Sequence, residues 1–359
     1  MTTALIQDFQ ARIQAASATG TPLRLRGGGS KDWYGQSLQG EVLDTRAYQG
    51  VVDYDPAELV ITARCGTPLA DIEALLAEHH QMLAFEPPHF GAATFGGMLA
   101  SGLSGPRRMA VGSVRDFVLG SKLMNGRGEV LSFGGTVMKN VAGYDVSRLL
   151  AGSLGTLGLI LEASIKVLPK PFAEATVQFE LDETSALQQL NTWGGQPLPL
   201  ASSAWHAGVL TLRLAGAEAA VKSARTKLGG QVLATSQAEA FWHSLREQTH
   251  AFFSTPTFSE NLALWRIATP STAAPLSLAG AQLTEWGGSQ RWLITDAPTA
   301  AVRQAAQAVG GHATLYRGGH PAEGVFTPLA APLLAIHRQL KQTFDPAGIF
   351  SRGRLYPEF

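Results

Sequence analysis

Hydrophobic positions along the chain change between strand spacing and helix spacing, and this pattern predicts a mixed α and β protein. Leu23 and Leu25 alternate with arginines, which is typical of a short strand. From Thr67 the spacing becomes helical: Thr67 can cap the helix, Pro68 suits its first turn, and one apolar face is formed by Leu69, Ile72, Leu75 and Leu76. A short strand is predicted next, over residues 82–85.

The following part of the chain carries a hairpin signal. Residues 118–135 contain an apolar strand, the turn dipeptide Asn125-Gly126 and a return strand. After the hairpin, the pattern predicts a short helix capped by Asp145, a glycine turn and a strongly apolar strand that ends at Pro169 and Pro171. The first domain is therefore expected to span residues 1–171.

The second half of the chain has a repeated pattern. A strand, an alanine-rich helix, a Gly-Gly pair and a second strand follow one another in residues 208–236 and again in residues 289–319. Two such units predict a ferredoxin-like α+β domain over residues 172–329, an antiparallel sheet with helices on one face. Residues 330–359 predict an amphipathic helix ending near Phe344 and a tail that packs back onto the first domain.

Composition limits the possible functions. The 359 residues are 45% hydrophobic and 16% charged, and 28 Lys and Arg balance 28 Asp and Glu, so nucleic-acid binding is not indicated. Cys65 is the only cysteine, so the chain cannot build a disulfide, a zinc cluster or an iron–sulfur cluster by itself, and no metal site is expected. No segment has the length and apolarity of a membrane span or signal peptide. We expect a cytoplasmic protein without direct membrane insertion, alone or held at a membrane by partner subunits.

Two glycine-rich stretches carry the candidate chemistry. The first, "LRLRGGGSK" at residues 23–31, is either a mobile turn or a backbone cradle whose N–H groups converge on a phosphate. It contains neither GxGxxG nor GxxxxGK[ST], so a Rossmann dinucleotide site and a P-loop are not supported. The second stretch, residues 89–123, is rich in glycine and small residues, which favours close approach of the backbone to a large ligand.

Four motifs in this order resemble one known family. "RGGGSK", "ATFGGMLASGLSG", "GYDVSRLLAGSLGTLGLILEASIKV" and "FDPAGIFSRGRLY" resemble FAD-linked oxidases of the vanillyl-alcohol oxidase and p-cresol methylhydroxylase (PCMH) type. The resemblance implies a FAD-binding domain of two α+β subdomains, followed by the ferredoxin-like domain as a cap. Within the family, "KNVAGYD" and "FWHSLREQTHAFF" look most like the FAD-binding E subunits of bacterial glycolate oxidase.

The resemblance also implies which residues bind FAD. By matching position, the first loop contributes Gly27, Gly28, Gly29, Ser30 and Lys31, and the second loop contributes Thr94, Gly96, Gly97, Ser101 and Gly102. Gly158 and Ile160 match positions beside the adenine end. Many relatives attach FAD through a histidine of the first loop, but Ser30 occupies that position here. We therefore expect FAD to be bound non-covalently.

Candidates for the remaining chemistry are weaker, and no catalytic residue is assigned. Oxidation of a 2-hydroxy acid needs a base for the hydroxyl proton and a cation for the carboxylate. Five residues have the right side chains, but each is more typical of an ordinary structural position, such as an exposed helix face or a loop: His206, His243, Arg246, His320 and Glu323. Cys65 lies in a strand-like run outside both loops, where a small buried residue is the ordinary interpretation.

The chain departs from the family at two places, and these bear on its role. Leu154 replaces a common glutamate, and Ser351-Arg352 replaces a common asparagine-proline pair. The resemblance implies a heteromeric complex with a larger FAD-containing glycolate-oxidising subunit and an iron–sulfur subunit. We interpret the chain as a non-covalent FAD-binding subunit that serves electron transfer or assembly. Two alternatives remain: a self-sufficient 2-hydroxy-acid dehydrogenase, and a structural subunit whose flavin pocket is empty.

Overall fold

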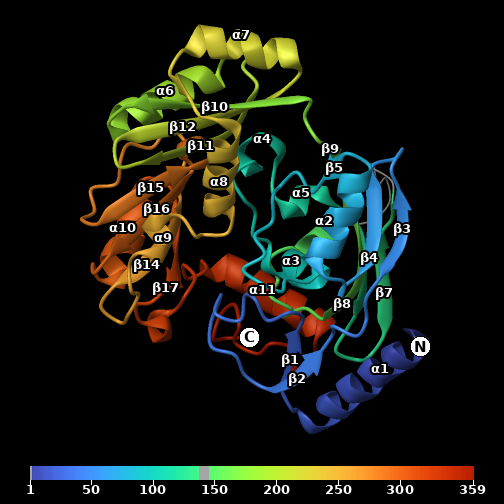
Figure 1. Cartoon of the computed structure of the whole chain (residues 1–359). Helices are drawn as coiled ribbons and strands as arrows, with labels where there is room; N and C mark the ends of the chain where they lie inside the picture. The colour runs from blue at the N-terminus through green and yellow to red at the C-terminus, as the bar shows by residue number, and fades with distance from the viewer. Residues whose placement is uncertain (1, 137–144) are drawn as a thin grey trace.

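The computed structural model describes residues 2–136 and 145–359, and the chain forms two lobes (Figure 1). The first lobe, blue to teal in Figure 1, begins with the helix α1 (Thr2–Thr19). It contains a parallel two-stranded sheet of β1 (Leu23–Arg26) and β2 (Glu41–Asp44). It also contains a five-stranded sheet with the order β3-β4-β8-β6-β7. Those strands span β3 (Val51–Asp55), β4 (Val60–Arg64), β6 (Val118–Met124), β7 (Val130–Gly134) and β8 (Leu159–Lys166).

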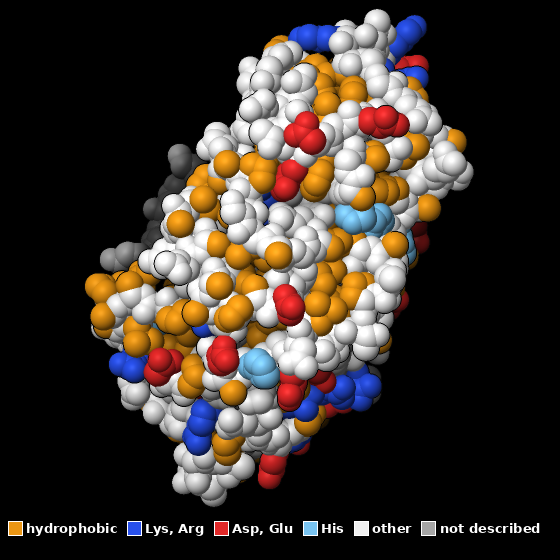
Figure 2. All heavy atoms as spheres, turned by 90° about the vertical axis from the view of Figure 1, so that its left-hand side faces the viewer, with side chains coloured by type: hydrophobic (Ala, Val, Ile, Leu, Met, Phe, Trp, Pro, Cys, Tyr) orange, Lys and Arg blue, Asp and Glu red, His pale blue; other side chains and the backbone are white. Residues whose placement is uncertain are grey.

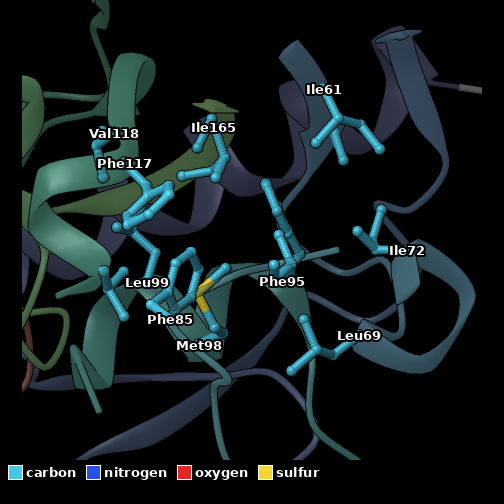
Figure 3. Close-up of a cluster of buried hydrophobic side chains, with 14 of the residues drawn as sticks. Ile61, Leu69, Ile72, Phe85, Phe95, Met98, Leu99, Phe117, Val118 and Ile165 are labelled. Atoms are coloured by element: carbon cyan, nitrogen blue, oxygen red, sulfur yellow. The ribbon is translucent and has the colours of Figure 1, made fainter. Parts of the chain in front are cut away.

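A hydrophobic core joins the five-stranded sheet to the helices that cover it (Figure 3). The helices are α2 (Leu69–Glu78), α3 (Phe95–Ser101), α4 (Arg108–Val111) and α5 (Val114–Phe117). Phe95, Met98 and Leu99 of α3 point into this core beside Phe85 and Ile165 (Figure 3). The second glycine-rich stretch is thus held against the sheet by its own apolar side chains, which leaves its glycines free to face other backbone.

Several sequence predictions for this lobe are confirmed, and others need correction. The hairpin of β6 and β7 closes where predicted, at residues 125–129. The helix α2 begins at Leu69, but Thr67 does not cap it, because the Thr67 hydroxyl donates to Arg64 O (2.7 Å) and accepts from Gly50 N (2.9 Å). The strand predicted over 82–85 is only β5 (Gln81–Met82), which pairs with β9 (Leu168–Pro169). The helix predicted after Asp145 is one 3-10 turn, η1 (Ser147–Leu150).

The second lobe, here called the cap, is built on one eight-stranded sheet with the order β13-β10-β12-β11-β15-β16-β14-β17. Its first half contains β10 (Ala173–Glu180), α6 (Glu183–Gly194), β11 (Leu200–His206), β12 (Val209–Gly216), α7 (Glu218–Leu228) and β13 (Gln231–Val232). Its second half contains β14 (Ala263–Ala268), β15 (Ala281–Glu285), η2 (Trp286–Gly288), β16 (Gln290–Thr295), α10 (Thr299–Ala308) and β17 (His312–Arg317). Each half has the ferredoxin-like strand order, so the sequence repeat corresponds to two such units joined edge to edge between β11 and β15.

Helices cover both faces of the cap sheet, whereas the sequence predicted them on one face. The helices α6, α7 and α10 pack on the outer face, where Val177 contacts Ala186 and Leu190 of α6. The helices α8 (Thr235–Arg246) and α9 (Ala251–Ser254) lie on the inner face with Trp242, Phe252 and Phe253 buried against it. Because successive strand residues face opposite sides, β10 can bury Val177 under α6 and present Thr176 to the Trp242 indole.

The chain returns from the cap to the first lobe. After η3 (Pro321–Glu323), helix α11 (Ala331–Phe344) crosses between the lobes, as its red ribbon shows in Figure 1. The tail then lies beside β1, where Leu23 N donates to Ile349 O (2.7 Å) and Ser351 N donates to Leu23 O (2.8 Å). The buried Lys341 ammonium donates to the Phe350 carbonyl (2.7 Å), which fixes the turn that leads into the tail. No helix in the described part of the chain is long and apolar enough to cross a membrane.

Candidate functional site

The first glycine loop leaves the end of β1 and is closed by ion pairs. Asp32 accepts hydrogen bonds from both Arg24 and Arg26, the latter at 2.9 Å. Inside this closure, Gly29 has φ +73°, and a Cβ there would lie 2.3 Å from the Arg26 guanidinium. A left-handed backbone in contact with a guanidinium leaves glycine as the residue that fits this position. The loop is therefore a built structure and not a mobile turn.

The two glycine loops lie in close contact with each other. A Cβ added to Gly27 would lie 2.2 Å from the Thr94 hydroxyl oxygen, and one added to Gly28 would lie 1.5 Å from Ala92 O. Both distances are far below van der Waals contact. The two loops therefore lie directly against each other, with the Thr94 side chain over Gly27 and the Ala92 carbonyl over Gly28. So close an approach suits a site in which backbone N–H groups of both loops bind one anion.

Two adjoining pockets lie between the loops. One is lined by residues of the first loop and α3, among them Gly27, Gly28, Gly29, Ser30, Lys31, Thr94, Gly97 and Ser101. The other extends toward β8 and is lined among others by Gly27, Gly96, Gly97, Gly158 and Ile160. Every predicted cofactor-binding residue except Gly102 lines one pocket or the other. Gly102 ends α3 with φ +63°, directly after Ser101.

Lys31 places a cation beside the first pocket. Its ammonium donates to His89 O (3.2 Å) and lies 5.4 Å from the centre of the Phe90 ring. Burial lowers the pKa of Lys31 to about 8, and the opposing charge of Glu247 only partly offsets this effect. A negatively charged ligand in the pocket would favour the protonated ammonium.

The structure adds pocket residues that the sequence analysis did not assign to the cofactor. Arg26, Thr45 and Cys65 line the pockets near the first loop, and Arg354 lines one from the C-terminal tail. Arg354 donates to Asp32 O (2.7 Å) and also to the carbonyls of Tyr34 and Gln36. Burial lowers its pKa to about 10, against the effect of Asp32. The only sequence signal was the pair of arginines in "SRGR", and the carbonyl partners of Arg354 are more than 300 residues earlier.

Both departures from the family pattern face these pockets. Leu154 lines both of them, and Ser351 lines the one that holds the first loop. Each has a positive φ, +50° at Leu154 and +41° at Ser351, so each stands at a turn. Cys65 is buried, as expected of a small core residue, but it also lines a pocket, and burial raises the pKa of its thiol to about 12.

On the cap side, aromatic residues approach this region together with two charged ones. The Arg317 guanidinium lies 4.9 Å from the centre of the Trp33 ring, and the Glu247 carboxylate accepts from Phe90 N (2.9 Å). Tyr34 and Leu103 of the first lobe are buried in one cluster with Trp292 and Tyr316 of the cap. The ring centres are 5.5 Å apart for Tyr34 and Tyr316, and 4.8 Å apart for Trp292 and Tyr316. Trp33 also packs on Tyr316, with ring centres 4.9 Å apart. The cap thus covers the end of the first loop with close-packed rings.

The histidines and charged residues considered for catalysis lie elsewhere. His243 and Arg246 line a separate pocket beside Arg213 and Trp242. His206 packs on the His250 ring, with centres 5.4 Å apart. His320 and Glu323 are exposed around η3. None of the five lines either pocket of the glycine loops, and residues 2–136 and 145–359 contain no group of three or more His, Cys, Asp or Glu that could hold a metal ion.

Comparisons with known proteins agree with this geometry. The chain matches the family described as "FAD binding domain" over residues 3–147. It is 48% identical to "Glycolate oxidase subunit GlcE" of Escherichia coli (strain K12) over 348 residues, which cover 97% of this chain and 96% of that protein. It is 31% identical to "Glycolate oxidase subunit GlcD" of Bacillus subtilis (strain 168) over 138 residues, 38% of this chain and 29% of that protein. A solved structure of alkyldihydroxyacetonephosphate synthase has the same fold, with a TM-score of 0.64, 16% identity, and coverage of 95% of this chain and 74% of that chain.

The fold and the glycine-loop site define an FAD-dependent oxidoreductase subunit of the PCMH-type class. The residues present fit the cofactor, because the pocket between the loops is lined by Gly27–Gly29, which leave the backbone accessible, and by the cationic Lys31, a lining suited to a pyrophosphate. Because the sequence similarity to subunit GlcE covers nearly the full length of both chains, this chain belongs to the family of the glycolate oxidase subunit GlcE.

Proposed function

We propose that this chain binds FAD non-covalently within a heteromeric glycolate oxidase and serves electron transfer, while a partner subunit oxidises the 2-hydroxy acid. Bound FAD supplies the electron-accepting chemistry. The residues proposed to hold it are the backbone of Gly27–Gly29, the Lys31 ammonium and the segment Thr94–Gly97. Arg354 supports this site from the tail by binding three carbonyls that follow the first loop.

One observation supports the proposal that a partner subunit oxidises the acid and that this chain transfers electrons. The Tyr316 ring of the cap packs on Trp33 and Tyr34 at the end of the first loop, and no histidine of the described residues lines either pocket of the glycine loops. The Glu247 carboxylate of the cap also lies here, but it is already bound by Phe90 N (2.9 Å) and by Arg246 (2.9 Å). A hydroxyl proton needs a base within hydrogen-bond reach, and a 2-hydroxy acid needs room beside the base. Tryptophan and tyrosine rings supply neither at neutral pH, and burial raises the pKa of Tyr316 still further. This arrangement suits a flavin that exchanges electrons and does not receive a hydroxy acid.

The proposed partners follow from the relatives. A larger subunit similar to glycolate oxidase subunit GlcD is proposed to oxidise glycolate, and an iron–sulfur subunit is proposed to carry electrons onward. The outer face of the cap is a candidate partner surface. Figure 2 shows that Asp, Glu, Lys and Arg are scattered thinly among hydrophobic side chains on this side of the molecule. Depletion of charge is the compositional sign of interface cores. Attachment to a membrane is proposed only through such partners.

The test compares the isolated chain with the chain in its complex. The purified chain is loaded with FAD, mixed anaerobically with glycolate, and followed by flavin absorbance before and after a GlcD-type partner is added. We expect reduction only in the presence of the partner. Reduction of the isolated chain would instead support the alternative of a self-sufficient 2-hydroxy-acid dehydrogenase.

A further inference from the structure

Two arginines from different lobes approach one tryptophan at the seam between the first lobe and the cap. The Arg108 guanidinium, on α4, lies 4.2 Å from the centre of the Trp286 ring, and the Arg266 guanidinium, on β14, lies 5.3 Å from it. The Trp286 indole N–H donates to Gly105 O (3.1 Å), so the ring is fixed between the lobes. Cation–π contacts of this kind hold a guanidinium in place but leave its charge uncompensated.

Neither guanidinium has an anionic partner of its own. Among the residues that the structure describes, Arg108 forms no ion pair and Arg266 donates only to the amide oxygen of Gln290 (2.7 Å). Two buried arginines at the same seam are paired: Arg107 binds Glu86 (3.1 Å), and Arg213 binds it at 2.7 Å. The seam therefore contains two pairs of arginines. Glu86 neutralises Arg107 and Arg213, whereas Arg108 and Arg266 form no ion pair within the described part of the chain.

The surroundings of this cluster reflect its uncompensated positive charge. Partial desolvation of the His312 ring lowers its pKa, and both arginines lower it further, which favours the neutral form of His312. Burial also lowers the pKa of Arg108, and Arg266 lowers it further against the effect of Asp116. On the cap side, burial raises the pKa of the Glu285 carboxyl to about 7, so that this carboxyl compensates Arg266 only in part. Like charges held together without a counter-ion are costly unless an anion joins them.

We propose that Arg108 and Arg266, with His312 at the rim, form a binding site for the carboxylate of a small organic acid. Arginine is suited to this task because its planar fork binds a carboxylate through two parallel N–H bonds. Both guanidinium groups are half-buried and His312 is exposed, so an acid can reach them from solvent. The site is separate from the glycine-loop pockets, whose linings include none of these three residues.

The proposed carboxylate site is linked through the backbone to the second glycine loop. Gly105, which accepts the Trp286 hydrogen bond, follows Ser101 and Gly102 by only a few residues, and Gly105 N donates to Phe85 O in the core (2.9 Å). The site also bridges the lobes, because α4 packs on β11 and η2 of the cap. A bound carboxylate would add contacts between α4 and β14 and thereby hold the cap against the loop.

The test measures binding of oxalate to the FAD-loaded chain by titration calorimetry at constant ionic strength. Oxalate is a small carboxylate without an oxidisable hydroxyl, so binding is separated from turnover. We expect saturable binding by the unaltered chain, and about tenfold weaker binding or worse in R108Q and in R266Q, since each loses a charge-assisted hydrogen bond. R108K keeps the charge and is expected to retain more of the affinity than R108Q.

The matched control is R225Q, because Arg225 is an exposed arginine of α7 outside this cluster. Melting temperature and flavin absorbance are recorded for every variant, so that loss of fold or of FAD is seen separately from loss of oxalate. The choice of a glycolate-like acid rests on the proposed function, but flavin content in the same sample tests that function independently. Absence of oxalate binding by the unaltered chain, or equal affinity in R108Q, R266Q and R225Q, would overturn the proposal.

Discussion

Thr94 occupies the space over Gly27, so that its hydroxyl oxygen lies 2.2 Å from the place where a Cβ of residue 27 would be. This one relationship joins the two glycine loops and explains why the first loop must be glycine at its start. Thr94 is itself held in place, since its hydroxyl accepts from Gly97 N (3.3 Å) at the beginning of α3. The site therefore depends on contact between two segments that are far apart in the sequence.

The substitution G27A is expected to separate the loops. The added methyl group cannot coexist with the Thr94 hydroxyl, so one loop must move and the backbone amides lose their alignment. We expect FAD affinity to fall about tenfold or more, as for the loss of one or more charge-assisted hydrogen bonds, measured by fluorescence of released flavin. G194A is the control, because nothing lies within 4 Å of a Cβ at that position. Equal flavin retention in both variants would contradict the assignment of the first loop.

FAD affinity is expected to depend on pH through Lys31. The free chain has a Lys31 pKa of about 8, and the phosphates favour the protonated ammonium. Affinity for FAD should therefore be highest below pH 8 and decline as pH rises through that value, because the neutral Lys31 amine must then take up a proton on binding. K31R is the informative variant, since its guanidinium stays charged and should give a flat profile between pH 7 and 9. A decline of the same size in K31R would show that another group is responsible.

The ion cluster around Glu86 is expected to stabilise the seam between the lobes. Glu86 bridges Arg107 and Arg213, and although burial alone would raise its pKa, these two arginines lower it below the ordinary value. E86Q leaves both arginines without their anion, so we expect a loss of about 3–5 kcal/mol in the free energy of unfolding. E174Q changes a more exposed partner of Arg107, with 40% side-chain exposure, and should cost about 1 kcal/mol or less.

The pH dependence of this cluster gives a second check. A carboxyl whose pKa is lowered by folding contributes stability above its unfolded pKa, and that contribution is lost as pH falls through the folded value. The difference in urea midpoint between the unaltered chain and E86Q should therefore be largest near neutral pH and shrink in acid. A difference that does not change with pH would mean that Glu86 acts through shape and not through charge.

The tail is expected to be part of the cofactor site. R354Q removes the donors to the carbonyls of Asp32, Tyr34 and Gln36, and each buried carbonyl left without a partner costs about 1–3 kcal/mol. We expect lower FAD retention together with faster proteolysis after residue 344. R352Q is the matched control, because Arg352 is exposed and donates to Gly348 O. The same FAD retention and the same cleavage rate in both variants would show that the tail is not part of the cofactor site.

The sequence predicted those features that local pattern determines. Glycine loops, the β6–β7 hairpin and the α7 and α10 repeats could be recognised because turn residues and hydrophobic periodicity act over a few residues. The carbonyl partners of Arg354 and the closing of the first loop by Asp32 could not be predicted, because they depend on how segments apart in the sequence meet. Thr67 shows the same limit on a smaller scale: it has the side chain of a helix cap, but the Arg64 carbonyl and the Gly50 amide satisfy its hydroxyl instead.

The most direct test of the account is an anaerobic absorbance spectrum of the purified chain with glycolate. The account predicts an oxidised flavin spectrum, with flavin that is released on denaturation because it is not covalently attached, and no bleaching by glycolate until the glycolate-oxidising partner is added. Bleaching by glycolate with the chain alone would contradict the proposed role in electron transfer. A chain that neither contains nor takes up flavin would contradict the cofactor site itself.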